Sequence, residues 1–257
     1  MPQKLPFHVV YVSSQDENFP ATELNHHHPA TKGWVSTRFC AYPQQLILAL
    51  EGRANFRKIQ VLCHQYLIAS KIEFFVGDTP DDEIKHFKNA NFSRLGYVAL
   101  SDNQATEFKA RELKSVHLDA SGSYIQLFLH KNHSNSLNLY SQVGIVAINI
   151  IGDFINRNPL SDPEDFPPVV HNTDYIPPTE DLAFDMYQDP EVANIIRRLE
   201  KQKRIAVMAE RFDQAQSMRD AIAQLQQVGE RLGRLALEKQ QAVEKENYEE
   251  ANLKRMK

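Results

Sequence analysis

Histidine is the residue type in this chain with the widest chemical range, yet its ten copies suggest no metal site. His26, His27 and His28 are consecutive, and three consecutive side chains point in different directions in any extended or turned backbone. His130 and His133 stand three residues apart at the end of an expected strand, where they face opposite sides of a sheet. Structural zinc needs about four converging ligands, so we expect no metal cofactor.

The two cysteines offer no nucleophile. Cys63 and His64 are adjacent, and adjacent strand residues point to opposite faces, so the imidazole cannot take the thiol proton. Cys63 lies in an alternating apolar run and is expected to pack as a small core side chain. The sequence also lacks a nucleophile elbow, a phosphate-binding loop and a dinucleotide fingerprint. We therefore expect no enzyme activity and no cofactor, and with Cys40 as the only other cysteine we expect a reducing, intracellular setting.

The remaining polar and aromatic residues suggest two candidate binding surfaces. The first is one rim of a β-sandwich, formed by loop residues: Trp34, Arg38, Asn132, His133 and Asn135. Trp34 fits a plug in the core as well as it fits a binding role. The second is a helical contact surface: Arg197, Arg198, Lys201, Phe212 and Tyr248. Its cations fit an acidic partner, and they equally fit the solvated face of a helix.

These residues need elements that position them, and residues 1–152 predict an all-β domain. Short apolar or alternating runs recur between turn-forming residues, which is the pattern of strands. The expected strands are residues 7–12, 45–50, 58–64, 68–76, 97–100, 113–119, 124–130 and 143–151. Residues 119–122 are expected to form a hairpin turn between two of them. This set of antiparallel strands favours a jelly roll or a similar sandwich.

Residues 153–180 predict a linker. They hold six of the 13 prolines and a net charge of −5, whereas residues 1–152 have a net charge of +1 and residues 181–257 have none. Proline removes backbone donors and like charges repel each other, so we expect an extended acidic segment between two domains.

Residues 181–257 change to a helical period. Asp189 and Pro190 indicate a helix start, with an aspartate cap and proline in the first turn. Residues 206–215 align with residues 242–251 at an offset of 36, a repeat length typical of helical hairpins. We expect the aromatic residue of each copy to pack at a hairpin corner, and the two glycines of this region to mark weak points or a bend. A coiled-coil seam is the alternative to intramolecular hairpins.

Composition limits the classes of function. Hydrophobic residues make up 42% of the chain and charged residues 24%, which is ordinary for a globular protein. No stretch approaches the roughly 20 apolar residues of a membrane helix, and the first residues lack the pattern of a secretion signal. The net charge of −4 favours neither nucleic acid nor an anionic membrane as a partner.

Several runs resemble one known family. They are residues 33–34, 38–40, 64–66, 70–74, 94–98, 110–116, 132–133, 140–143, 146–152, 181–191 and 229–234. These runs resemble the N-terminal part of the centrosomal protein of 104 kDa family, a family of ciliary-tip proteins. The resemblance implies a jelly roll of the galactose-binding-like or discoidin-like type, followed by a coiled coil. It also implies that a tubulin-binding TOG domain, zinc fingers and an end-binding motif lie beyond Lys257.

The resemblance leads to two main hypotheses of function. The first is a non-catalytic scaffold of the cytoskeleton that docks ciliary-tip or centriolar proteins, at the cilium tip and the centriole or centrosome. Tubulin and microtubule end-binding proteins would then be contacted mainly through regions beyond this chain. The alternative is a lectin-like sandwich that binds sugar or calcium, which predicts a pocket with an aromatic platform. Direct microtubule binding is a third hypothesis, and the near-neutral charge of residues 1–152 counts against it.

Overall fold

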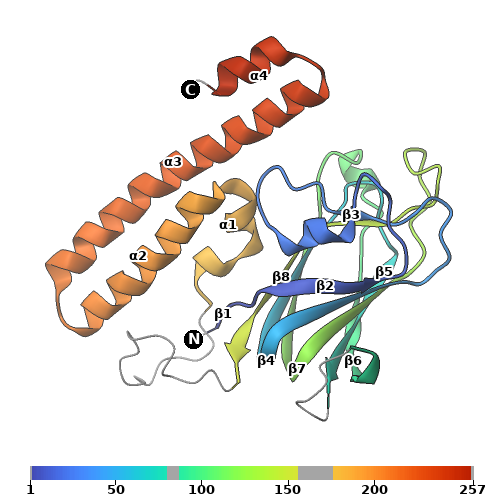
Figure 1. Cartoon of the computed structure of the whole chain (residues 1–257), viewed down its shortest axis with the longest axis horizontal. Coiled ribbons are helices and arrows are strands. Elements are labelled where there is room, and N and C mark those ends of the chain that lie inside the picture. Colours follow the sequence, from blue (N-terminus) through green and yellow to red (C-terminus); the bar gives the residue numbers. More distant parts are fainter. Residues whose placement is uncertain (1, 80–86, 156–175, 256–257) are drawn as a thin grey trace. The chain divides into compact units, whose positions relative to one another are not determined.

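The computed structural model describes residues 2–79, 87–155 and 176–255 (Figure 1). The chain divides into two compact units. The β unit comprises Met1–His26 and Lys32–Ile176, and the helical unit comprises His27–Thr31 and Pro177–Lys257. Most of the segment expected to be a linker, residues 156–175, lies outside the described residues.

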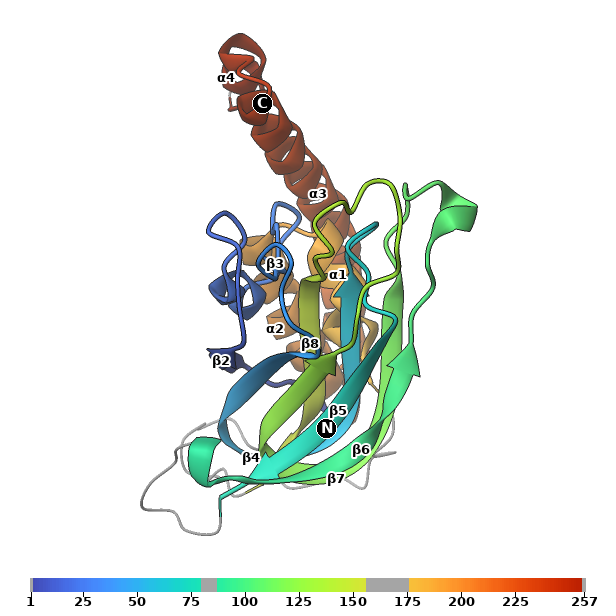
Figure 2. The same cartoon turned by 90° about the vertical axis from the view of Figure 1, so that its right-hand side faces the viewer.

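The β unit is antiparallel in every described strand pair. Its strands are β1 (Gln3–Lys4), β2 (Phe7–Val12), β3 (Trp34–Val35), β4 (Gln44–Cys63), β5 (Lys71–Asp78), β6 (Asn91–Ala99), β7 (Leu113–Leu129) and β8 (Gly144–Phe154). They pair in the order β1-β8-β4-β7-β5-β6, with β2 beside β4 and β3 beside β8. The expected antiparallel sandwich is confirmed, and Figure 2 shows its curved strands.

Two long strands, β4 and β7, take part in both layers of this sandwich. The first half of β4 pairs with β2 and with the end of β7, whereas its second half pairs with β8 and with the start of β7. The ladder is interrupted between Ala49 and Ala54, where β4 passes from one layer to the other. One layer therefore also contains β5 and β6, and the other contains β1, β3 and β8.

The hairpin turn expected at residues 119–122 is wrong. These residues lie inside β7, and Gly122 stays paired with Ala54 of β4. A Cβ atom on Gly122 would lie 2.6 Å from the carbonyl oxygen of Gly77, so the absence of a side chain permits a close approach of two strands. The glycine marks a change of layer, not a reversal of the chain. The four strands expected at residues 45–50, 58–64, 113–119 and 124–130 are thus the halves of β4 and β7.

One hydrophobic core lies between the two layers. Leu46, Ile72 and Leu127 contribute to it from one layer, and Ile59 and Ile148 contribute from the other. All five side chains are fully or almost fully buried. The alternation of apolar and polar residues along these strands places the apolar set on this inner face.

Among the described residues, the helical unit contains four α-helices, α1 (Leu182–Tyr187), α2 (Pro190–Met208), α3 (Phe212–Glu244) and α4 (Tyr248–Arg255). The helix start predicted at Asp189 is confirmed, because its side chain accepts hydrogen bonds from the amides of Glu191 and Val192, both at 3.1 Å. Val192, Ile196 and Ile222 form the core between α2 and α3. The helices fold back on one another as hairpins, and a coiled coil is not confirmed (Figure 1).

The repeat corresponds to two equivalent helix corners. The Arg211 amide donates to the Ala206 carbonyl at 2.8 Å after α2. Thirty-six positions later, the Asn247 amide donates to the Ala242 carbonyl at 2.9 Å after α3. The same backbone geometry therefore ends both helices, which explains the repeat in the sequence.

The aromatic residues of the repeat do not pack at these corners. Phe212 is 64% exposed and Tyr248 is 65% exposed, so that expectation is wrong. Each aromatic residue is the first residue of the helix that follows its corner. The alanines on either side of the corners are buried, whereas the aromatic rings are not: Ala206, Ala215, Ala242 and Ala251. Small side chains allow the helices to approach each other, and the rings are left in solvent.

The two glycines of α3 serve close packing. The Asp189 amide donates to the carbonyl of Gly229 at 3.1 Å. A Cβ atom on Gly229 would lie 2.9 Å from Cγ1 of Val192, and one on Gly233 would lie 2.9 Å from the carbonyl oxygen of Tyr187. The turn between α1 and α2 therefore rests directly on the α3 backbone, and α3 continues through both glycines.

Candidate functional site

Four connections meet at one end of the β unit, which we call the rim. The Ser70 amide donates to the Lys131 carbonyl at 2.9 Å, and the Leu100 amide donates to the Ser70 carbonyl at 3.1 Å. The connections are residues 36–43, 64–70, 100–112 and 130–143. Surface loops are usually mobile, and these backbone hydrogen bonds connect the loops to one another.

Buried amide side chains hold the rim together. Nδ2 of Asn103 donates to the carbonyls of Gln65 and Ala110, at 2.9 and 2.7 Å. Nε2 of Gln142 donates to the Ser36 carbonyl at 2.7 Å. Buried and satisfied polar groups fix loop geometry, so the rim is a rigid platform.

Three predicted rim residues have this structural role. Asn132 is buried, and its Nδ2 donates to the carbonyl of His133 at 2.9 Å. Nε2 of His133 lies 3.0 Å from the Leu100 carbonyl, and Nδ2 of Asn135 donates to the Tyr66 carbonyl at 2.9 Å. These side chains point into the loops that they join. The role in partner binding that the sequence suggested for them stays a prediction.

Trp34 is a core residue, and the prediction that it forms part of a binding rim is wrong. Its side chain is 0% exposed and belongs to the main hydrophobic cluster. The indole Nε1 donates to the Ser14 carbonyl at 3.0 Å, which satisfies its one polar atom. An aromatic ring of this size is most stable where it leaves water completely.

Four exposed residues of the rim contact one another or adjoin in sequence, Arg38, Phe39, Leu139 and Tyr140, and we call them the rim cluster. The rings of Phe39 and Tyr140 are edge to face, with centroids 5.7 Å apart. The Arg38 guanidinium lies 4.4 Å from the centroid of the Tyr140 ring. Phe39 is 72% exposed and Leu139 is 73% exposed, so two large apolar side chains project into solvent.

The backbone that presents the rim cluster is held in a sparsely populated conformation. Phe39 has a φ of 53° and Ser141 has a φ of 50°, in the left-handed region that non-glycine residues avoid. The Phe39 amide donates to the Tyr140 carbonyl at 2.8 Å, and the Tyr42 hydroxyl donates to the Ser141 carbonyl. Strain of this kind persists only where neighbouring contacts enforce it, and it is concentrated at functional sites.

Of the rim cluster, sequence reasoning selected Arg38 and missed Phe39, Leu139 and Tyr140. The available signal was two leucines and a tyrosine in a polar run rich in asparagine and serine, residues 134–142. Such residues are expected to be buried, so a loop that exposes them is informative only when its geometry is known.

The comparisons with known proteins agree with the resemblance stated above. Residues 33–152, which include the whole rim cluster, match the family model described as Centrosomal protein CEP104, N-terminal domain. The Mus musculus protein named Centrosomal protein of 104 kDa is 48% identical over 257 residues, which are 91% of this chain and 28% of that protein. The Homo sapiens protein of the same name is 47% identical over 253 residues, 91% of this chain and 27% of that protein.

The chain belongs to the family of the centrosomal protein of 104 kDa. It spans little more than a quarter of the length of these CEP104 relatives. The names of these relatives connect the family with the centrosome and describe no enzyme.

Solved structures share the fold only distantly. The family 32 CBM from C. perfringens NanJ, in complex with galactose, is 13% identical with a TM-score of 0.46 and covers 59% of this chain and 99% of that one. Reduced XRCC1 bound to the DNA pol beta catalytic domain is 14% identical with a TM-score of 0.44, and it covers 57% of this chain and 97% of that one. Galactose and the polymerase domain are partners of those proteins.

Cys63 and His64 of this CEP104 relative do not form a nucleophile and base. Cys63 is buried, and burial raises the pKa of its thiol to about 12. Nδ1 of His64 accepts hydrogen bonds from the backbone amides of Tyr66 and Leu67, at 3.3 and 3.2 Å. Burial, and next the charge of Arg111, lower the pKa of His64 to about 4, so the imidazole is neutral near pH 7 and fixes a loop.

The described residues offer neither a metal cluster nor a membrane-spanning helix. Residues 2–79, 87–155 and 176–255 contain no group of three or more His, Cys, Asp or Glu placed to hold a metal ion. In the same part of the chain, no helix is long and apolar enough to span a membrane.

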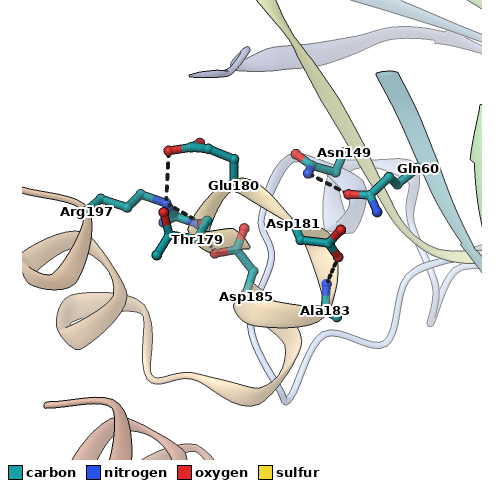
Figure 3. Close-up of polar contacts among 8 residues, drawn as sticks. All are labelled: Gln60, Asn149, Thr179, Glu180, Asp181, Ala183, Asp185 and Arg197. Carbon is teal, nitrogen blue, oxygen red and sulfur yellow. Dashed lines mark hydrogen bonds and ion pairs between the residues drawn. The ribbon is translucent and has the colours of Figure 1, made fainter. Parts of the chain in front are cut away.

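In the helical unit, Arg197 is not available for a partner. It forms an ion pair with Asp185, and its Nε donates to the Thr179 carbonyl at 3.1 Å (Figure 3). Its guanidinium also lies 5.5 Å from the centroid of the Phe184 ring. The predicted contact residue is therefore a clamp that ties the segment before α1 to α2. The other predicted contact residues are exposed: Arg198, Lys201, Phe212 and Tyr248.

Replacing this clamp is expected to destabilise the helical unit. Arg197→Ala removes the cation that faces the Asp185 carboxylate, which is only 4% exposed, and we expect a loss of about 2–3 kcal/mol in the free energy of unfolding. Arg198→Ala removes an exposed cation from the same helix and should change stability by less than about 0.5 kcal/mol. Urea denaturation followed by the circular dichroism of the helices measures both. Equal effects of the two substitutions would contradict the clamp.

Proposed function

We propose that this chain is a non-catalytic docking module of a centrosomal protein, and that the rim cluster is the surface that contacts a partner protein. The observation that carries the proposal is the exposure of Phe39 and Leu139 on a rigid rim. Exposed apolar side chains contribute little to folding, and on a fixed platform they are typical of protein interfaces. Aromatic and arginine anchors together are the residue types that dominate such interfaces.

The family supports the setting of this proposal. Relatives named as centrosomal proteins support a place at the centrosome or centriole. We extend this to a cytoskeletal scaffold at the ciliary tip, whose β unit docks ciliary-tip or centriolar proteins. Contacts with tubulin and with microtubule end-binding proteins are assigned to parts of the relatives that this chain does not span. No observation in the described residues favours the sugar- or calcium-binding alternative.

The test is the enrichment of the fluorescently tagged 257-residue chain at centrosomes and ciliary tips of cultured cells. Phe39→Ser, Leu139→Ser and Tyr140→Ser together should lower the enrichment about tenfold, because a few anchors carry most of the energy of an interface. The matched control replaces two exposed residues outside the rim, Val10→Ser and Tyr97→Ser, and should keep the enrichment. Both chains should retain the melting temperature of the parent. Undiminished enrichment of the rim variant would refute the proposal.

A further inference from the structure

The charged side chains of the two loops that form the rim cluster are all positive. Residues 36–43 and 130–142 contain two cations, Arg38 and Lys131, and no aspartate or glutamate. Both cations are exposed, and within the described part of the chain neither forms an ion pair. Residues 1–152 as a whole have a net charge of only +1, so the excess of positive charge on these two loops is local.

The geometry of Arg38 prepares it for a carboxylate. The Tyr140 ring lies on one side of the guanidinium, 4.4 Å from it, and restricts its motion. The N–H donors of a stacked guanidinium stay in its own plane, where a carboxylate can accept two of them at once. A cation that is already ordered loses less conformational entropy when it binds.

Apolar side chains adjoin this cation. Phe39 reaches solvent beside Tyr140, and Leu139 precedes Tyr140 in the same loop. A bound ligand that covers either side chain gains about 1.5–3 kcal/mol for each one that leaves water completely. The site therefore combines one anion-binding group with an apolar surface on two neighbouring loop tips.

We infer that the rim cluster binds an extended peptide segment of its partner, in which an acidic side chain lies next to a large apolar one. This inference rests on the proposed function and names the chemistry of the partner. The acidic side chain pairs with Arg38, and the apolar one packs on Phe39 and Leu139. Basic segments are rejected because Arg38 repels them.

The test selects random linear peptides displayed on phage against the immobilised 257-residue chain, with counter-selection on the chain carrying Phe39→Ser and Leu139→Ser. The enriched peptides should contain aspartate or glutamate beside leucine, isoleucine or phenylalanine. For a synthetic peptide of that sequence, Arg38→Glu should raise the Kd at least about tenfold. Arg198→Glu, an equal change of charge on α2, should leave the Kd within a factor of about two. A lysine in place of the peptide's acid should restore binding to the Arg38→Glu chain.

The outcomes separate the inference from the proposed function. Enriched peptides without acidic residues, which bind through Phe39 but ignore Arg38→Glu, would overturn the inference and leave a docking rim. Failure to enrich any peptide that depends on the rim would also overturn it, and the centrosome enrichment of the rim variant then decides the function by itself. Arg38 and Phe39 are exposed, so the variants should keep the parent melting temperature.

Discussion

A chain carrying Gly33→Ala is expected to have a strongly destabilised β unit. Gly33 has a φ of 81°, which alanine adopts at a cost of about 1 kcal/mol. An added Cβ atom would lie 2.3 Å from the carbonyl oxygen of Ile145 and 2.5 Å from Cα of Val146. Both atoms belong to the backbone of β8, which cannot move aside as a flexible side chain could. We expect a loss of about 3 kcal/mol or more in the free energy of unfolding.

Hydrogen exchange of the core amides of β4 and β7 measures this loss, because these amides exchange through global opening of the β unit. The matched control is Gly52→Ala in β4, where the nearest atom to an added Cβ is a side-chain carbon of Phe154 at 3.6 Å. That distance is an ordinary contact, so the control should exchange like the parent. Unchanged protection in Gly33→Ala would show that β3 and β8 are further apart than the structure places them.

The neighbouring substitution Trp34→Ala is expected to cost about 3–5 kcal/mol, the range for removing a large aromatic side chain from a core. Trp34 is 0% exposed, and the change also removes the donor to the Ser14 carbonyl. Phe39→Ala lies five residues away and should change stability by less than about 0.5 kcal/mol, because the ring is mostly in solvent. Core-amide exchange compares the two without relying on the fluorescence of the single tryptophan.

The two substitutions should reduce binding by different routes, Phe39→Ala by removing a contact and Trp34→Ala by destabilising the fold. Phe39→Ala should lower the affinity for the peptides selected on the rim and leave the fold intact. Trp34→Ala should lower the affinity only to the extent that it unfolds the β unit. A Trp34→Ala chain that is as stable as the parent but loses binding would return Trp34 to the binding surface, as the sequence alone allowed.

The contrast between Trp34 and Phe39 shows how far the sequence could be interpreted. Alternation of apolar and polar residues predicted where strands lie, because burial of one sheet face imposes it. It did not predict which loop aromatic is buried, since both stand in runs of similar polarity. That outcome depends on contacts from distant residues, such as Ser14 to Trp34 and Tyr140 to Phe39.

Glycine was the least predictable residue type. The sequence predicted a turn at Gly122, yet strand β7 continues through it. The glycine has no side chain, and this allows β5 to lie close to β7. The sequence predicted a weak point of a helix at Gly229. Instead, α3 continues there, and the Gly229 carbonyl accepts a hydrogen bond from the Asp189 amide. Sequence identifies the freedom of a glycine, but only tertiary packing decides whether that freedom is used for a bend or for proximity.

Local signals in the helical unit were more reliable. The cap at Asp189 could be predicted because the hydrogen bonds that define it involve only the next three residues. The 36-residue offset could be found because both corners need the same backbone path. Arg197 could not be assigned, since its partners Thr179 and Asp185 lie on other elements.

The passage of β4 and β7 through both layers has a consequence for how this domain can vary among relatives. The pairings of Gln44 with Leu129 and of Leu62 with Leu113 bring both ends of the two strands to the rim. Rim loops can therefore gain, lose or exchange residues while every register of the sandwich is kept. A single residue inserted within one half of either strand would instead turn the side chains of the rest of that half to the other face of its layer. The residues of the rim loops can therefore change during evolution, whereas the pairing register of the strands that support them is constrained.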